Sequence, residues 1–335
     1  MNTSRRDFLK HTTCLAFGGI MLKGLPSFSE KTSPVLVQRA FYTMGTVVKI
    51  TAYGTSKQEL HSAITKVQDE FQRIDAWMSV YRNDSHVSLI NQAAGKKEVQ
   101  VNHAVMDVLC SAKKFNENTQ GAFNICVEPM MRLWGFRNDT RALARMPSER
   151  EVCQAQEAVS IHNLVIDEKE NKAGLLHEEA SIDLGGIAVG YSVDRAGAIL
   201  RSAGITNFLI NHSGDILAAG SPPEQDGWLI SIPDPKNPKE MITNFSIKDR
   251  ALSTSGNHES FVTIHDKHFG HIMDPQTGYP SDRLLSFTAI CPTAIEADAY
   301  STGYFCNGIV HTGMAYIAVT SDSDIVMSDN ITNTN

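Results

Sequence analysis

The apolar residues from Leu60 to Met78 form the most constraining pattern in this chain of 335 residues. They recur at intervals of three or four residues, the spacing of a single helix face: Leu60, Ile64, Val67, Phe71, Ile74 and Met78. Ser56, followed three residues later by Glu59, is a typical N-cap with a capping box. The segment therefore predicts a long amphipathic helix that buries one face.

Most of the remaining chain favours short strands joined by turns. The run 35–53 is rich in β-branched and aromatic residues and is interrupted near Gly45, which predicts one or two strands. We expect further strands at 164–166, 181–184, 208–210, 228–232, 261–264, 269–272 and 285–291, a hairpin with Asp322-Ser323 at its tip, and helices at 103–116, 148–158, 187–203 and 293–307. This order predicts an α+β fold with mixed, largely antiparallel sheets flanked by helices. We expect one domain over residues 35–330.

Composition excludes several classes of protein. The net charge is −7, and no dense Lys/Arg run occurs beyond the first ten residues, so we expect no nucleic-acid partner. Apart from the N-terminus, no apolar run approaches the roughly 20 residues of a membrane-spanning helix. A hydrophobic fraction of 42% is typical of a globular protein with a large core.

The N-terminus has the pattern of an export signal. Ser4-Arg5-Arg6-Asp7-Phe8-Leu9-Lys10 matches a twin-arginine motif, and a short apolar stretch follows it. We expect residues 1–30 to be a signal peptide read by the twin-arginine export machinery. The mature protein would then be periplasmic, either free or associated with the membrane.

A first candidate site lies at Asp183-Leu184-Gly185-Gly186, directly before a predicted helix. A helix N-terminus offers free N–H groups, and glycine lets a phosphate come close to the backbone. The pattern is equally compatible with a tight turn that binds no ligand.

A second candidate site is a helix face that carries Asp298, Ser301 and Thr302, at positions i, i+3 and i+4. One carboxylate and two hydroxyls are too few ligands to hold a metal alone. They suit Mg²⁺, which keeps water ligands and takes others from substrate phosphates. The alternative is a solvated helix face with no ligand.

A third candidate is His271, three residues before Asp274 in an Asp-Pro turn. An imidazole there can serve as acid or base near neutral pH. The alternatives are an Asx-turn with a capping histidine, or a transition-metal cluster with His258, His265 and His268, which a hairpin tip at Asp266-Lys267 would splay apart.

Taken together and in this order, these motifs resemble the FAD:protein FMN transferases, the ApbE family. The resemblance spans the mature chain through Met44-Gly45-Thr46, Met78-Ser79-Val80-Tyr81, Gly121-Ala122-Phe123-Asn124, Leu133-Trp134-Gly135-Phe136, Asp183-Leu184-Gly185-Gly186, Asn211 to Asp215, Thr254-Ser255-Gly256, His271 to Gly278 and Asp298 to Thr302.

The resemblance implies a Mg²⁺-dependent transferase that uses FAD as substrate. It would attach FMN to a Thr or Ser hydroxyl of an acceptor protein, a subunit of an exported or membrane redox complex, and release AMP. It implies Mg²⁺ ligands at Gly186, Asp298, Ser301 and Thr302, and an FAD site lined by Met44, Tyr81, Ala122, Phe123, Asn124, Asp183, Val189 and Ile272. His271 is the candidate for activating the acceptor hydroxyl, with Asp274 orienting it or its loop.

Three positions depart from the family pattern. Asn124 stands where the family usually has Asp, Val189 where it usually has Lys or another polar residue, and Ser213 where it usually has Gly. Two alternative functions remain open. One is an FAD pyrophosphatase that uses water as acceptor, and the other is a periplasmic flavin-binding protein without turnover.

Overall fold

The protein is described here by a computed structural model of residues 34–137, 145–257, 260–308, 313–329 and 331. The expected signal peptide, residues 1–30, lies outside the described residues. All described residues belong to one compact unit, Pro34–Asn335.

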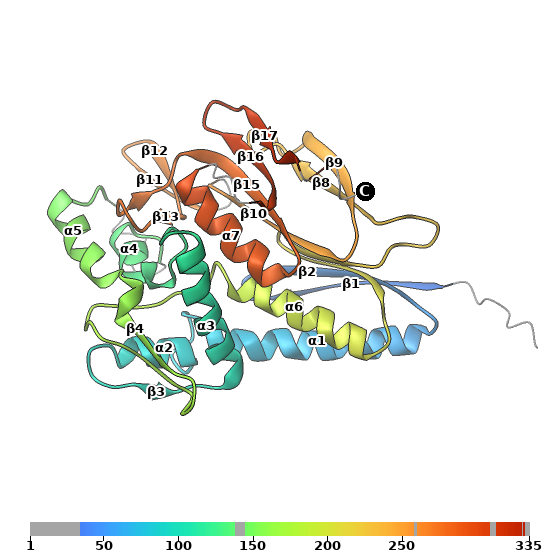
Figure 1. The fold of residues 1–335 in the computed structure, drawn as a ribbon, viewed down its shortest axis with the longest axis horizontal. Coiled ribbons are helices and arrows are strands. Elements are labelled where there is room, and N and C mark those ends of the chain that lie inside the picture. The colour runs from blue at the N-terminus through green and yellow to red at the C-terminus, as the bar shows by residue number, and fades with distance from the viewer. Residues whose placement is uncertain (1–33, 138–144, 258–259, 309–312, 330, 332–335) are drawn as a thin grey trace, which may run out of the picture. The chain divides into compact units, whose positions relative to one another are not determined.

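An antiparallel sheet forms the centre of the described structure (Figure 1). Its strand order is β1-β2-β6-β7-β10-β15-β16-β17, and every neighbouring pair is antiparallel. The strands are β1 (Val35–Thr43), β2 (Thr46–Gly54), β6 (Asn207–His212), β7 (Asp215–Ala219), β10 (Arg250–Gly256), β15 (Leu284–Cys291), β16 (Ala315–Thr320) and β17 (Ile325–Met327). The predicted α+β class with largely antiparallel sheets is confirmed.

Period-two patterning gives this sheet two buried faces. In β7, Leu217 joins the core beneath the helices, whereas its neighbour Ile216 joins the core on the opposite face. The helical layer consists of α1 (Lys57–Met78), α6 (Ala188–Ser202) and α7 (Ala294–Asn307). The hairpin of β8 (Trp228–Pro233) and β9 (Met241–Ile247) covers the other face. Because successive side chains of a strand point to opposite faces, one strand serves both cores.

The three helices pack on one another as well as on the sheet. In Figure 1, α6 lies alongside α1, and α7 crosses β10 and β15. Helix α1 buries the predicted apolar stripe, and the Ser56 hydroxyl accepts a hydrogen bond from the Glu59 N–H. Helix α6 ends at Ser202 with Ala203 as its C-cap, within one residue of the expected end, and Gly204 follows at φ +75°.

A second core lies beside the sheet. It is built by α2 (His86–Gln92), α3 (His103–Asn118) and the small sheet of β3 (Val99–Gln100), β4 (Leu164–Asp167) and β5 (Lys172–Leu175). A further apolar cluster joins a short 3₁₀ turn and two helices to two hairpins. The turn and helices are η1 (Ile125–Val127), α4 (Glu128–Leu133) and α5 (Glu149–Ala158), and η3 (Ile161–Asn163) follows α5. The hairpins are β11 (Phe261–Ile264) with β12 (Lys267–Gly270), and β13 (Met273–Asp274) with β14 (Tyr279–Pro280).

The strand expected at 181–184 is wrong. This segment has no regular secondary structure and joins no sheet. The Asn91 side chain instead pairs with both backbone groups of Ile182, at 2.8 and 2.9 Å, and Asp183 N–H donates to the Ile125 carbonyl at 2.8 Å. Because a side chain and a loop carbonyl satisfy the backbone, the segment needs no neighbouring strand.

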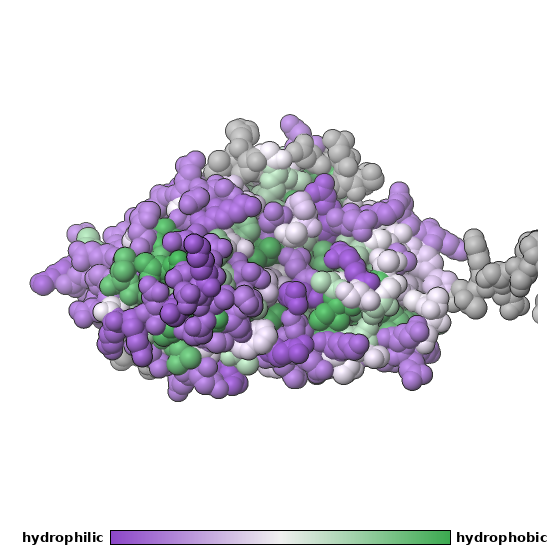
Figure 2. Space-filling view, turned by 60° about the horizontal axis from the view of Figure 1, so that its bottom comes forward, coloured by the Kyte–Doolittle hydropathy of each residue, from purple (hydrophilic) through white to green (hydrophobic). Residues whose placement is uncertain are grey.

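Hydrophilic side chains cover most of the face drawn in Figure 2, and hydrophobic residues gather there in separate small patches. No helix in the described part of the chain combines the length and the apolar character that a bilayer crossing requires.

Candidate active site

A cavity of ≈ 360 Å³ opens where the main sheet, α6, α7 and the second core meet. It brings together segments from distant parts of the chain. Its lining includes Thr46, Tyr81, Ala122, Phe123, Asn124, Arg137, Asp183, Gly186, Val189, His212, Ser213, Asp215, Ser255, His271, Ile272, Asp298 and Thr302.

One end of the cavity is built by the contact of α6 with α7. The buried Asp298 carboxylate accepts a hydrogen bond from the Gly190 N–H at 2.9 Å. Asp194 of α6 caps α7, accepting from the N–H groups of Ala294 and Ile295 at 2.9 Å each. The start of α7 is therefore fixed by a residue of α6, and Asp298 is held one turn further on.

Gly186 lies directly against Thr302. A Cβ atom at Gly186 would be 3.1 Å from the Thr302 Oγ1 atom, so only glycine leaves this hydroxyl undisturbed. Ser301 is fully buried behind this surface, where its hydroxyl bonds the Ser255 hydroxyl at 2.9 Å. Of the predicted helix face, Asp298 and Thr302 line the cavity, whereas Ser301 supports them from within the core.

The polar end of the cavity concentrates negative charge. Burial raises the pKa of Asp298 well above its usual range, and the nearby Asp215 carboxylate raises it further, opposed by the Gly190 hydrogen bond. A divalent cation would relieve both effects. Among the described residues, no group of three or more His, Cys, Asp or Glu side chains could hold a metal. The donor set therefore fits Mg²⁺, which takes few protein ligands, better than a transition metal.

His271 is half-buried at the cavity wall, and its Nδ1 atom lies 3.1 Å from the Ser260 carbonyl oxygen. Because a carbonyl oxygen only accepts, this contact makes Nδ1 the protonated nitrogen of the neutral ring and leaves Nε2 as the basic one. Asp274 instead lines a neighbouring cavity of ≈ 460 Å³. Its carboxylate accepts from the N–H groups of Gln276 and Thr277, which is the Asx-turn alternative.

Tyr81, Ala122, Phe123 and Ile272 line the same cavity, with the Phe123 ring close to Gly186. Asn124 serves both as donor and acceptor here: its amide donates to the Val159 carbonyl at 2.7 Å and accepts from the Cys126 N–H at 2.9 Å. An aspartate could not donate the first bond, so the local structure fits Asn124. Met44 packs between the two cores near this region but does not line the cavity.

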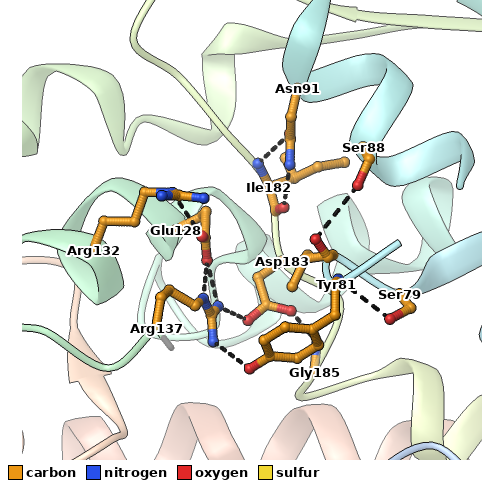
Figure 3. A network of polar contacts seen from close by, with 11 residues as sticks. Ser79, Tyr81, Ser88, Asn91, Glu128, Arg132, Arg137, Ile182, Asp183 and Gly185 are labelled. Atoms are coloured by element: carbon orange, nitrogen blue, oxygen red, sulfur yellow. Dashed lines mark hydrogen bonds and ion pairs between the residues drawn. The ribbon is translucent and has the colours of Figure 1, made fainter. Parts of the chain in front are cut away.

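Several residues of the cavity were not proposed as site residues from the sequence, among them Arg137, His212 and Asp215. Arg137 is 6% exposed and contacts Glu128, Asp183 and Tyr81 (Figure 3). His212 and Asp215 flank the β6–β7 turn, in which Ser213 adopts φ +52° and contacts the Thr46 hydroxyl. That left-handed backbone explains why glycine suits position 213. The sequence signal available was the run Asn211 to Asp215, which marked the segment without assigning roles.

Eleven of the fourteen predicted site residues thus line one cavity, and Met44, Asp274 and Ser301 do not. Asp298 and the Gly186 turn line the same cavity. The individual roles assigned to these residues stay predictions.

Comparisons with known proteins agree with this architecture. The ApbE family model matches residues 44–327. The chain is 28% identical over 301 residues to an FAD:protein FMN transferase of Salmonella typhimurium, covering 88% of this chain and 85% of that protein. A Klebsiella pneumoniae protein of the same name is 27% identical over 295 residues, covering 86% and 84%. The crystal structure of the ApbE protein of Thermotoga maritima superposes with a TM-score of 0.82 at 27% identity, covering 90% of this chain and 99% of that one.

The fold is thus that of a flavin-transferase type of protein. The chain belongs to the ApbE family. The family resemblance read from the sequence is confirmed.

Proposed function

We propose that this protein is an FAD:protein FMN transferase. It moves FMN from FAD to a Thr or Ser hydroxyl of an acceptor protein and releases AMP. The observation that carries the proposal is the single cavity in which Asp298 and Thr302 of α7 face the Gly186 turn, with His271 on the wall. Relatives that bear this activity in their names, matched over most of their length, support it.

The reaction exchanges one phosphorus–oxygen bond for another. The acceptor hydroxyl oxygen attacks the phosphorus atom on the FMN side of the pyrophosphate, and a phosphodiester to the protein forms. The bond from that phosphorus to the bridging oxygen breaks, so AMP leaves with the bridging oxygen. The hydroxyl proton passes to a base. Such a transfer depends on positioning and on neutralising charge.

The residues of the cavity suit these tasks. Asp298, Thr302 and the Gly186 carbonyl would hold Mg²⁺, with Ser301 keeping the Thr302 segment in place. Bound there, the cation would neutralise charge on the pyrophosphate. The basic Nε2 atom of His271 would take the hydroxyl proton. Tyr81 and Phe123 would lie against flat rings of FAD.

The acceptor is proposed to be a subunit of an exported or membrane redox complex, and the protein to be periplasmic. This proposal rests on the Arg5-Arg6 motif, which lies outside the described residues. Replacing both arginines with lysine should abolish export, which cell fractionation would measure. Export that is unaffected would contradict the twin-arginine route.

The function itself is tested with FAD, Mg²⁺ and a co-expressed periplasmic redox subunit. Mass spectrometry should find one FMN added to a Thr or Ser of that subunit, and chelation by EDTA should prevent it. Free FMN and AMP formed without acceptor would favour the pyrophosphatase. FAD that stays bound and intact would favour the binding protein, for which the departures at Asn124 and Val189 are the sequence argument.

A further inference from the structure

Arg137 is a buried guanidinium that no site prediction from the sequence includes. Its Nε atom donates to Glu128 at 2.7 Å, one terminal nitrogen contacts both Glu128 and Asp183, and the other donates to the Tyr81 hydroxyl at 3.2 Å. Figure 3 shows it at the centre of this network, between α4 and the Asp183 segment. Burying an arginine this completely is favourable only if its donors are satisfied by fixed partners.

The chain places Arg137 there by ending α4 abruptly. Gly135 has φ +79°, its N–H donates to the Arg132 carbonyl, and the Phe136 N–H donates to the Met131 carbonyl at 2.8 Å. These two bonds form a Schellman motif, which reverses the chain after the helix. Trp134 anchors the same turn by donating from its indole nitrogen to the Gly278 carbonyl at 3.0 Å. Arg137 therefore points back across α4 toward the cavity.

The contacts of Arg137 continue to the glycine turn. One Asp183 oxygen accepts from Arg137, and the other accepts from the Gly185 N–H at 2.8 Å. Gly186, the next residue, faces Thr302. The Asp183 carboxylate bonds both Arg137 and the Gly185 N–H, and Glu128 holds Arg137 in turn. The position of the Gly185-Gly186 backbone therefore depends on Arg137.

The same guanidinium fixes the outer wall of the cavity. Tyr81 is 66% exposed, so packing alone holds its ring weakly. Arg137 contacts its hydroxyl and lies over its ring, with the guanidinium carbon 5.7 Å from the ring centroid. Both walls, Tyr81 and the Asp183–Gly186 turn, are thus attached to one buried side chain.

Glu128 keeps Arg137 in place. Its carboxylate is buried, and burial raises its pKa while the hydrogen bond from Arg137 lowers it. Arg132 also contacts Glu128, at 3.2 Å. The two arginines and two carboxylates balance in charge, so the cluster does not itself attract a free anion.

We propose that Arg137 is a positioning residue for FAD: it holds Tyr81 and the Asp183–Gly186 turn at the separation that the dinucleotide requires. This inference rests on the proposed function, and it assigns Arg137 no contact with the reacting atoms.

The test compares Arg137→Met, Arg137→Lys and wild type. FAD affinity is measured by flavin fluorescence without Mg²⁺, and KM and kcat are measured with Mg²⁺ and acceptor. We expect Arg137→Met to weaken FAD binding about tenfold to a hundredfold, because several charge-assisted bonds are lost, and to raise KM more than it lowers kcat. Arg137→Lys keeps the charge but lacks the planar guanidinium, so its FAD affinity should lie between those of wild type and Arg137→Met.

Arg195→Met is the matched control, because Arg195 also pairs with a buried glutamate, Glu70, at 3.2 Å and lies outside the cavity. It should bind FAD like wild type. Unchanged FAD affinity in Arg137→Met, with only a lower melting temperature, would overturn the proposal. If Arg137→Met does not fold, Tyr81→Phe and Arg137→Lys decide, and wild-type affinity in both rejects it. Failure of the wild-type protein to bind FAD would reject the proposed function instead.

Discussion

The Asp298 carboxylate on α7 accepts a hydrogen bond from the backbone N–H of Gly190 on α6, at 2.9 Å. One side chain thereby joins two helices of the central layer and still lines the cavity. The contact is possible because Gly190 has no side chain: a Cβ atom there would lie 2.7 Å from the Asp298 Cβ atom. The helix contact and the polar end of the cavity are therefore one structural feature.

Asp298→Asn should abolish most transfer. The amide still accepts from the Gly190 N–H, so the helices stay joined, but the negative charge that would bind Mg²⁺ is lost. We expect kcat to fall about 100-fold or more, and the Mg²⁺ concentration for half-maximal activity to rise. Steady-state assays over a Mg²⁺ series measure both. Glu296→Gln, on the same helix outside the cavity, is the control. Equal Mg²⁺ dependence in Asp298→Asn and wild type would remove Asp298 from the metal site.

His271→Ala should slow transfer about 10² to 10⁴-fold and leave FAD affinity unchanged, because the proposed role of the imidazole is to accept a proton and not to hold the dinucleotide. Acceptor labelling and FAD titration measure the two effects separately. His268→Ala, an exposed position in the preceding hairpin, should retain activity. Full transfer by His271→Ala with intact FAD binding would assign the proton transfer to another group.

Gly190→Ala should destabilise the fold. The added Cβ atom would lie 2.3 Å from the Ala294 carbonyl oxygen, a backbone atom that cannot move without shifting α7. We expect a loss of about 3 kcal/mol in the free energy of unfolding, measured by urea denaturation. Ser202→Ala, exposed in the same helix, should change it by less than about 0.5 kcal/mol. A Gly190→Ala protein as stable as wild type would mean that the helices separate at little cost.

His212 should make stability depend on pH. Burial lowers its pKa to about 4, against an opposing contact from the Thr43 backbone. Between about pH 6.5 and pH 4 the unfolded chain therefore binds a proton that the native protein does not, so stability falls as the pH is lowered through this range. Across the whole range this pKa difference lowers the free energy of unfolding by about 3 kcal/mol.

Urea denaturation at a series of pH values measures this. The stability difference between wild type and His212→Leu should shift in favour of the variant as the pH falls from 7 to 4.5. His61→Gln, exposed on α1, is the control and should follow wild type. Parallel curves for wild type and His212→Leu would show that His212 does not titrate in this range.

The elements that the sequence predicts well carry their information locally. The stripe from Leu60 to Met78 with its Ser56 cap, and the helix that ends before Gly204, depend on residues within a few turns of one another. The strand at 181–184 was wrong because its backbone partners are Asn91 and Ile125, which no local pattern reveals. Ser301 and Thr302 each share a helix face with Asp298 by spacing, but only the tertiary packing buries the Ser301 hydroxyl against Ser253 and leaves Thr302 in the cavity.

The sequence by itself determined the α+β class, because periodicity and capping are properties of neighbouring residues. It also determined the family through the order of its motifs, and that resemblance implied eleven of the residues that line the cavity. Only the tertiary structure decided that Arg137 meets Asp183 and Tyr81, 46 and 56 residues away, and that Gly190 meets Asp298, 108 residues away. Such pairings arise when separate elements bury their apolar faces together. Their polar groups then have to find partners among whichever residues the packing brings within reach.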